Sequence, residues 1–192
     1  MNYYALLLIV VLLLAMYFLL GSFLWGAGYQ PTPRSVLLRM MAMARIGPKD
    51  RVYDLGAGTG ALVVRALDEG ADSVVGIEIE PIRFWFLRWR QRRHPRGDHL
   101  ELLREDFFKA DLSDATVVLV FLWPGAMRRL DEKFRRELRP GTRVVSYWHP
   151  LEGWRALEED RKKRVYGYEV PTSLRPAPLG SGSSAGPPGA PT

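Results

Sequence analysis

The chain has 192 residues, a length that suits one domain with extensions. Its formal net charge is +6, and arginine carries most of it, because only five of the 27 basic residues are lysines. The absence of cysteine excludes disulfides, thiolate catalysis and zinc–thiolate sites. The three histidines, His94, His99 and His149, show no metal-ligand spacing. We therefore expect no metal site.

The N-terminal segment is a long apolar run. Residues 3–25 carry no charge, and the first charged side chain is Arg34. As a helix this run is about 34 Å long, enough for a bilayer core of roughly 30 Å. A buried core helix would normally show a polar stripe, and a cleaved signal peptide would normally begin with basic residues. The run therefore predicts an N-terminal transmembrane helix, within an anchor of residues 1–28.

Basic residues follow this run and none precedes it. They are Arg34, Arg39, Arg45, Lys49 and Arg51. By the positive-inside rule, the rest of the chain lies in the cytoplasm. The sequence thus predicts a single-pass membrane protein with a cytoplasmic domain.

Residues 29–170 alternate between apolar strands and amphipathic helices. A first helix precedes the sheet, with Thr32 as its N-cap, Pro33 in its first turn and apolar residues repeating at helical spacing over 36–44. Strands are expected at 52–55, 73–79, 100–104, 115–122, 143–148 and 164–170, and further helices at 61–67, 81–93 and 125–138. This alternation predicts an α/β domain with a doubly wound parallel sheet. Residues 171–192 are rich in Pro, Gly, Ser and Ala and predict a disordered tail.

A glycine-rich loop follows the first expected strand. Asp54 ends the apolar run, and Gly56, Gly58 and Gly60 follow at every second position. In an open α/β sheet, ligands bind beyond the carboxyl ends of the strands, where glycines let the backbone approach closely. An acid at this point is unfavourable for a pyrophosphate. It suits a ligand with a cationic amino group, as in S-adenosylmethionine.

Two more acids end the next two strands. Glu78 is placed to accept hydrogen bonds from ribose hydroxyls, and Asp106 from an adenine amine, with Phe107 packing on the adenine ring. Three acids at successive strand ends, together with the glycine loop, resemble the class I S-adenosylmethionine-dependent methyltransferases. The resemblance implies a Rossmann-like methyltransferase sheet. A nicotinamide-binding or cofactor-free Rossmann-like domain is the alternative.

Further segments resemble a narrower family. They are Tyr-Gln-Pro-Thr-Pro at 29–33, Val-Tyr-Asp-Leu-Gly at 52–56, Asp-Leu-Ser-Asp-Ala at 111–115, the run from Arg136 to Ser146, and Pro150 with Gly153-Trp154. Over residues 26–155 the chain is similar to the small membrane-anchored protein-lysine methyltransferases that include the modifier of the ATP synthase c subunit, and to their soluble archaeal relatives. Thr59 and Ala61 depart from the Asp and Arg usual in that family's loop. The resemblance implies methyl transfer to a lysine of a protein, membrane proteins included.

Lysine methylation requires a neutral amine, whose pKa is near 10.4 in water and falls in a desolvated mouth. Trp123 and Pro124, after the fourth expected strand, are placed to line that mouth. Trp123 either holds an ammonium group by a cation–π contact or packs under the following helix. His149 is either a proton acceptor or an ordinary loop histidine. Tyr29 and Thr32 are candidates for a lid over the cofactor as well as a helix-entry turn.

The helix over 82–93 carries five arginines among aromatic residues. Ile82, Trp85, Phe86 and Trp89 fit a stripe that packs on the core. The helix is either a solvated arginine face over this stripe or a surface for anionic lipid or an acidic partner. No nucleic-acid recognition motif is present, so we expect no nucleic-acid partner.

Three functions remain open from the sequence. The first is a membrane-anchored methyltransferase acting on a protein lysine. The second is methylation of a lipid or quinone-like small molecule, and the third is a catalytically silent binding subunit on a methyltransferase fold.

Overall fold

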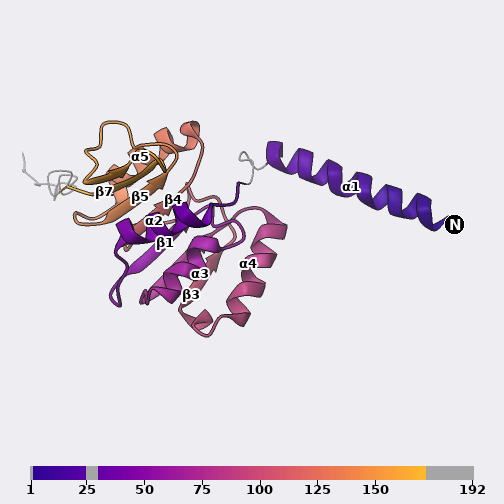
Figure 1. Cartoon of the computed structure of the whole chain (residues 1–192), viewed down its shortest axis with the longest axis horizontal. Coiled ribbons are helices and arrows are strands. Elements are labelled where there is room, and N and C mark those ends of the chain that lie inside the picture. Colours follow the sequence, from indigo (N-terminus) through magenta and orange to yellow (C-terminus); the bar gives the residue numbers. More distant parts are fainter. Residues whose placement is uncertain (1, 25–29, 172–192) are drawn as a thin grey trace, which may run out of the picture.

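The computed structural model describes residues 2–24 and 30–171 of the chain. Its centre is a seven-stranded sheet in the order β3-β2-β1-β4-β5-β7-β6 (Figure 1). The strands are β1 (Arg51–Leu55), β2 (Ser73–Ile77), β3 (Leu100–Leu103), β4 (Val117–Val120), β5 (Arg143–Tyr147), β6 (Glu158–Asp160) and β7 (Val165–Glu169). The chain crosses from β3 at the edge back to β4 beside β1, so the strand order reverses between β1 and β4, and this is the switch point where α/β sheets bind ligands.

The sheet is mixed, which corrects the expectation of a parallel one. Strands β1 to β5 are parallel, but β7 pairs antiparallel with both β5 and β6. A short turn joins β6 to β7, and so short a connection permits only antiparallel pairing. Strand β6 was not predicted, because Glu158, Glu159 and Asp160 give no apolar signal at this sheet edge.

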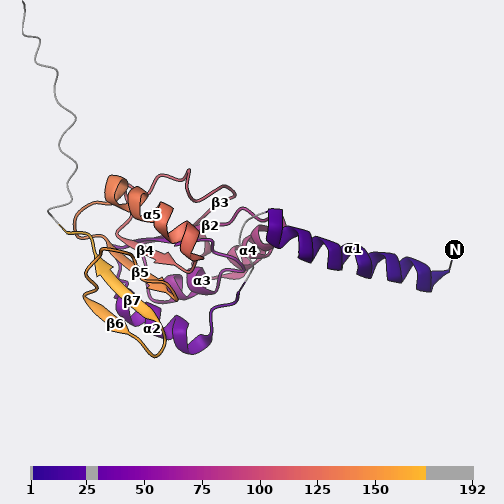
Figure 2. The ribbon, with the colours of Figure 1, turned by 90° about the horizontal axis from the view of Figure 1, so that it is seen from above.

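Helices cover both faces of the sheet. Helices α2 (Arg34–Ala44), α3 (Ala61–Asp68) and α4 (Pro81–Arg93) contribute to one apolar core, and α5 (Pro124–Glu137) to the other. Figure 2 shows α5 on the side of the sheet opposite α2. The doubly wound arrangement is confirmed, and a short 3₁₀ turn, Gly97–His99, precedes β3.

Two strands, β2 and β4, end two residues earlier than expected. Strand β2 stops at Ile77, which leaves Glu78 in the loop that follows, and β4 stops at Val120. The predicted cap of α2 was wrong, because Pro33 takes the N-cap position and no side chain caps this end. Thr32 is therefore available for the cavity described below.

Helix α4 turns the opposite face to the core from the one predicted. Ile82, Trp85, Phe86 and Trp89 are exposed, and Leu87 is the residue that α4 buries. The predicted core stripe was therefore wrong. Leu87 packs on Gly60 and Gly76, where an added β-carbon would meet its side chain. Helix α4 therefore lies too close to these glycines for a tryptophan to fit between them.

The N-terminal apolar run forms α1 (Tyr3–Leu24), which stands apart from the sheet (Figure 1). Every α1 side chain that the structure describes is exposed. In the described part of the chain, no helix is found to be long and apolar enough for a membrane span. The transmembrane anchor is thus unconfirmed. Tyr29 and the expected tail beyond Pro171 lie outside the described residues.

Candidate active site

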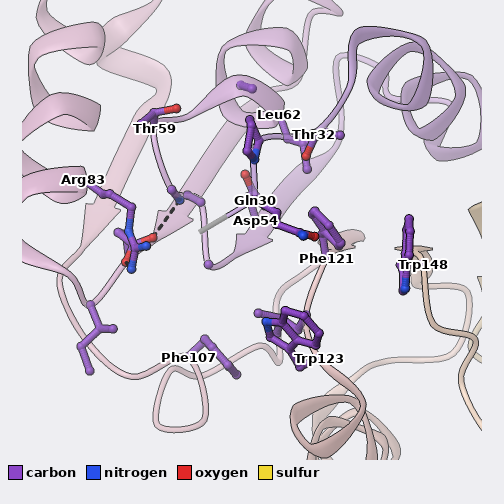
Figure 3. Close-up of a pocket in the computed structure, with 18 of the residues that line it drawn as sticks. Gln30, Thr32, Asp54, Thr59, Leu62, Arg83, Phe107, Phe121, Trp123 and Trp148 are labelled. Atoms are coloured by element: carbon purple, nitrogen blue, oxygen red, sulfur yellow. Dashed lines mark hydrogen bonds and ion pairs between the residues drawn. The ribbon is translucent and has the colours of Figure 1, made fainter. Parts of the chain in front are cut away.

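A cavity of about 250 Å³ opens at the carboxyl ends of the strands, beside the switch point. Residues from both halves of the sheet contribute to it. Its lining comprises Gln30, Pro31, Thr32, Asp54, Gly56, Ala57, Gly58, Thr59, Ala61, Leu62, Glu78, Ile79, Arg83, Arg90, Phe107, Phe121, Leu122, Trp123, Trp148 and His149. The cavity has an acidic end near the glycine loop and an aromatic end, which Figure 3 shows.

The glycine loop has a backbone conformation that would be strained for residues other than glycine. Gly56, Gly58 and Gly60 all have positive φ angles, of 80°, 56° and 84°. The backbone N–H groups of Gly56 and Ala57 donate to the carbonyl of Ile77 at 3.0 and 2.8 Å, which fastens the loop to β2. At Gly60 a β-carbon would lie 2.4 Å from Cδ1 of Leu87. This position therefore requires glycine for its backbone angle and for the approach of α4.

Asp54 is a buried carboxylate at the end of β1. It is 3% exposed, and no donor within the described residues hydrogen-bonds to its side chain. Burial, and secondarily the negative charge of Glu78, raise the pKa of Asp54 to about 7. A buried acid without a donor is costly unless a ligand supplies one. The cationic amino group of S-adenosyl-L-methionine fits this requirement.

Glu78 braces the loop from the end of β2. One carboxylate oxygen accepts from Gly58 N at 2.9 Å, and the other accepts from Glu80 N at 2.8 Å. Arg83 Nη2 lies 3.3 Å from Glu78 Oε1 and is part of α4. Glu80 caps α4 by accepting from the backbone N–H groups of Ile82 and Arg83. Since a carboxylate oxygen accepts more than one hydrogen bond, Glu78 still has capacity for ribose hydroxyls.

Aromatic side chains form the other end of the cavity. Phe107 follows β3, Phe121 and Trp123 follow β4, and Trp148 follows β5. Trp123 is 50% exposed, so it lies at the mouth rather than under a helix. His149 also lines the cavity, and burial together with the charge of Arg164 lowers its pKa. Its ring is therefore largely neutral near pH 7.

Trp148 was not predicted, and its backbone is unusual. Its φ of 76° lies in the left-handed region, which bulky residues rarely adopt. The Trp148 N–H donates to the carbonyl of Arg164 at 2.7 Å, and the Arg164 guanidinium lies 4.3 Å from the centre of the Trp148 ring. These contacts hold the ring at the cavity. Strained backbone of this kind is concentrated at functional sites.

Most of the predicted site residues meet in this cavity. Thr32, Asp54, Gly56, Gly58, Glu78, Phe107, Trp123 and His149 line it. Gly60 is outside the lining and forms the N-cap of α3, and Pro124 begins α5 and lines a second hollow. Asp106 is outside the lining, and its Oδ1 accepts from Phe108 N at 3.0 Å. Arg83, Arg90 and Phe121 were missed, because helix and strand patterns do not reveal which residues face a cavity.

The sequence matches a known family in this region. The model of the ANTKMT methyltransferase domain matches residues 54–158. The chain is 36% identical over 131 residues to a protein-lysine N-methyltransferase of Saccharolobus islandicus, and the match covers 68% of this chain and 81% of that protein. It is 32% identical over 103 residues to the lysine N-methyltransferase of the ATP synthase c subunit from Xenopus laevis, and this match covers 54% of this chain and 45% of that protein.

A solved structure agrees with the fold and the cofactor. The RNA methyltransferase from Salinibacter ruber, in complex with S-adenosyl-L-homocysteine, superposes with a TM-score of 0.71 at 34% identity, over 79% of this chain and 98% of that one. The resemblance inferred from the sequence is confirmed. The chain belongs to the ANTKMT methyltransferase domain family and is a class I methyltransferase that uses S-adenosyl-L-methionine.

Proposed function

We propose that the protein transfers a methyl group from S-adenosyl-L-methionine to the ε-amine of a lysine in a protein partner. The names of its relatives support this acceptor. The observation that carries the proposal is the two-ended cavity. At one end lies Asp54, a buried acid to which the described residues donate no hydrogen bond, and at the other lies an aromatic mouth with a neutral histidine.

The acidic end binds the cofactor. Asp54 receives its cationic amino group, and Glu78 accepts from its ribose hydroxyls while fixing the glycine loop through Gly58. Phe107 offers an apolar surface for the adenine ring. The bound S-adenosyl-L-methionine supplies an electrophilic methyl group. The protein contributes mainly by positioning donor and acceptor.

The aromatic end prepares the acceptor. Phe121, Trp123 and Trp148 exclude water from an entering lysine, which lowers its pKa and favours the neutral amine. The faces of the tryptophans also attract the ammonium form by about 0.5 to 2 kcal/mol, which helps capture it. His149 is neutral near pH 7 and takes up the proton that the lysine releases.

The test is a labelling experiment with the full chain. The protein is incubated with membranes, soluble proteins and RNA in the presence of methyl-labelled cofactor, and the label is followed into protein, lipid and RNA fractions. We expect label in protein, recovered as methyl-lysine after hydrolysis. Asp54→Asn should abolish the label. Asp98→Asn is the matched control, because Asp98 is exposed and remote from the cavity lining. Label recovered without methyl-lysine would reject the proposal.

RNA methylation is the second candidate. It is favoured by the similarity to the Salinibacter ruber RNA methyltransferase and by the five arginines of α4. The prediction of no nucleic-acid partner remains untested. Label running with RNA would support this candidate. Label in a lipid extract would support methylation of a lipid or quinone-like molecule, and absence of cofactor binding in calorimetry would support a silent binding subunit.

We further propose that the protein is held at a membrane through residues 3–25, with its domain on the cytoplasmic side. The supporting observations are the charge-free apolar run, the exposure of the described α1 side chains, and the basic residues that follow. The expressed full chain should stay with membranes after alkaline carbonate extraction. Release into the supernatant, or protection of the domain from protease added on the cytoplasmic side, would contradict the proposal.

A further inference from the structure

The outer face of α4, made of Ile82, Trp85, Phe86 and Trp89, is an exposed apolar stripe. These residues are spaced by three and four positions, so they lie along one side of the helix. Trp85 is 66% exposed and Ile82 53%. Single exposed apolar residues are ordinary, but a contiguous group with two tryptophans indicates an interaction surface.

The charges that α4 itself carries are all positive. Helix α4 contains five arginines and no acid. Arg83 pairs with Glu78 and Glu80, but within the described residues no acidic side chain pairs with Arg88, Arg92 or Arg93. Arg93 lies 4.2 Å from the ring centre of Trp89, which leaves its charge beside the apolar surface. Tryptophan beside arginine is the composition that suits the headgroup region of a bilayer.

The position of α4 places this face near α1. Arg83 and Arg90 of α4 line the cofactor cavity, and so do Gln30, Pro31 and Thr32. Five residues lie between the end of α1 at Leu24 and Gln30, and the six Cα–Cα steps across them can span at most about 20 Å. Figures 1 and 2 both show α4 on the side of the domain from which α1 extends. A membrane that holds α1 therefore lies within reach of the outer face of α4.

We propose that the outer face of α4 binds the surface of an anionic lipid bilayer, with its aromatic side chains among the headgroups and Arg88 and Arg92 against lipid phosphates and carboxylates. This contact directs the cavity mouth toward acceptors close to the bilayer. The inference rests on the proposed membrane association and is independent of whether lysine is the acceptor. Anionic lipid satisfies both features of the face, since an acidic soluble partner would leave the tryptophans without an apolar environment.

The test follows Trp85 and Trp89 in the full chain incorporated into vesicles. The vesicles contain phosphatidylcholine alone or phosphatidylcholine with phosphatidylserine, and a small share of lipids carries a nitroxide that quenches fluorescence near the headgroups. Subtracting the signal of a Trp85→Phe/Trp89→Phe variant isolates the α4 tryptophans. We expect strong quenching with phosphatidylserine, and weak quenching without it or at high salt.

Charge reversal supplies matched variants. Arg88→Glu/Arg92→Glu should reduce lipid docking of α4 by at least about 30-fold, because the loss of two basic contributions of about 1 kcal/mol each gives this factor before the repulsion of the new carboxylates is added. Lys162→Glu/Lys163→Glu changes the charge equally in the β6–β7 turn, at the other edge of the sheet, and should leave quenching unchanged.

The outcomes distinguish lipid docking by α4 from membrane association through residues 3–25. Vesicle flotation without α4 quenching would overturn this inference and leave membrane association standing. Failure of the intact chain to float with either vesicle would overturn both. Loss of binding to a labelled RNA in Arg88→Glu/Arg92→Glu, without any lipid quenching in the parent protein, would assign the face to RNA and reject the lipid proposal.

Discussion

Asp54 and Glu78 lie at the ends of neighbouring strands, and the charge of Glu78 adds to burial in raising the pKa of Asp54 to about 7. The two acids differ in their hydrogen-bond partners. Glu78 accepts two backbone N–H groups and faces Arg83, whereas the described residues offer Asp54 no donor. Glu78 is therefore held by hydrogen bonds within the protein, whereas Asp54 requires a donor from a ligand.

Cofactor binding should weaken in mild acid. A cationic amino group binds the ionised form of Asp54, so binding below pH 7 must release a proton. The dissociation constant for S-adenosyl-L-methionine should rise up to about tenfold for each pH unit below 7. Calorimetry between pH 5.5 and 8, repeated in buffers of different ionisation enthalpy, measures both effects. A flat profile with no proton release would contradict this role of Asp54.

Removing the charge of Asp54 should stabilise the protein without cofactor at pH 8. The unfolded chain loses this proton near pH 3.8 and the folded chain near 7, so the folded state binds more protons between these values. Its stability therefore falls as pH rises through that window. Asp54→Asn should raise the Tm at pH 8 by several degrees and have less effect at pH 4. An equal or lower Tm at pH 8 would show that Asp54 is not destabilising.

The sequence predicts the acidic end of the site better than the aromatic end. Asp54 and Glu78 were found because parallel strands end at one edge, so a residue's place in the strand pattern gives its position. Trp148 was missed because its ring reaches the cavity through a left-handed backbone after β5, which no local pattern reveals. The orientation of α4 was mistaken because periodicity does not say which face packs, and Leu87 alone fits over Gly60 and Gly76.

Gly60→Ala should destabilise the fold and impair cofactor binding. The new β-carbon would stand at φ 84° and 2.4 Å from the fully buried Leu87, so both the loop and α4 must shift. The free energy of unfolding should fall by about 1 to 3 kcal/mol. Gly125→Ala is the control, because a β-carbon there meets nothing within 4 Å, and it should be neutral or stabilising by up to about 1 kcal/mol. Denaturant unfolding compares the two, and equal effects would contradict the packing argument.

Trp148→Ala should impair acceptor use and spare cofactor binding. Its ring lies at the aromatic end of the cavity with Trp123, and a cation–π contact of about 0.5 to 2 kcal/mol corresponds to a rise in the acceptor KM of about 2- to 30-fold. Trp148→Phe keeps an aromatic face and should recover part of the loss.

The acceptor KM and the cofactor dissociation constant together distinguish acceptor binding by Trp148 from a purely structural role. Calorimetry should give the same cofactor dissociation constant for Trp148→Ala and the parent protein, because Asp54 and Glu78 are untouched. A general collapse of the site would weaken both ligands together. If cofactor binding fell in parallel with acceptor use, Trp148 would have a structural role in the turn after β5, where its N–H donates to the carbonyl of Arg164. The aromatic mouth would then consist of Trp123 and Phe121 alone.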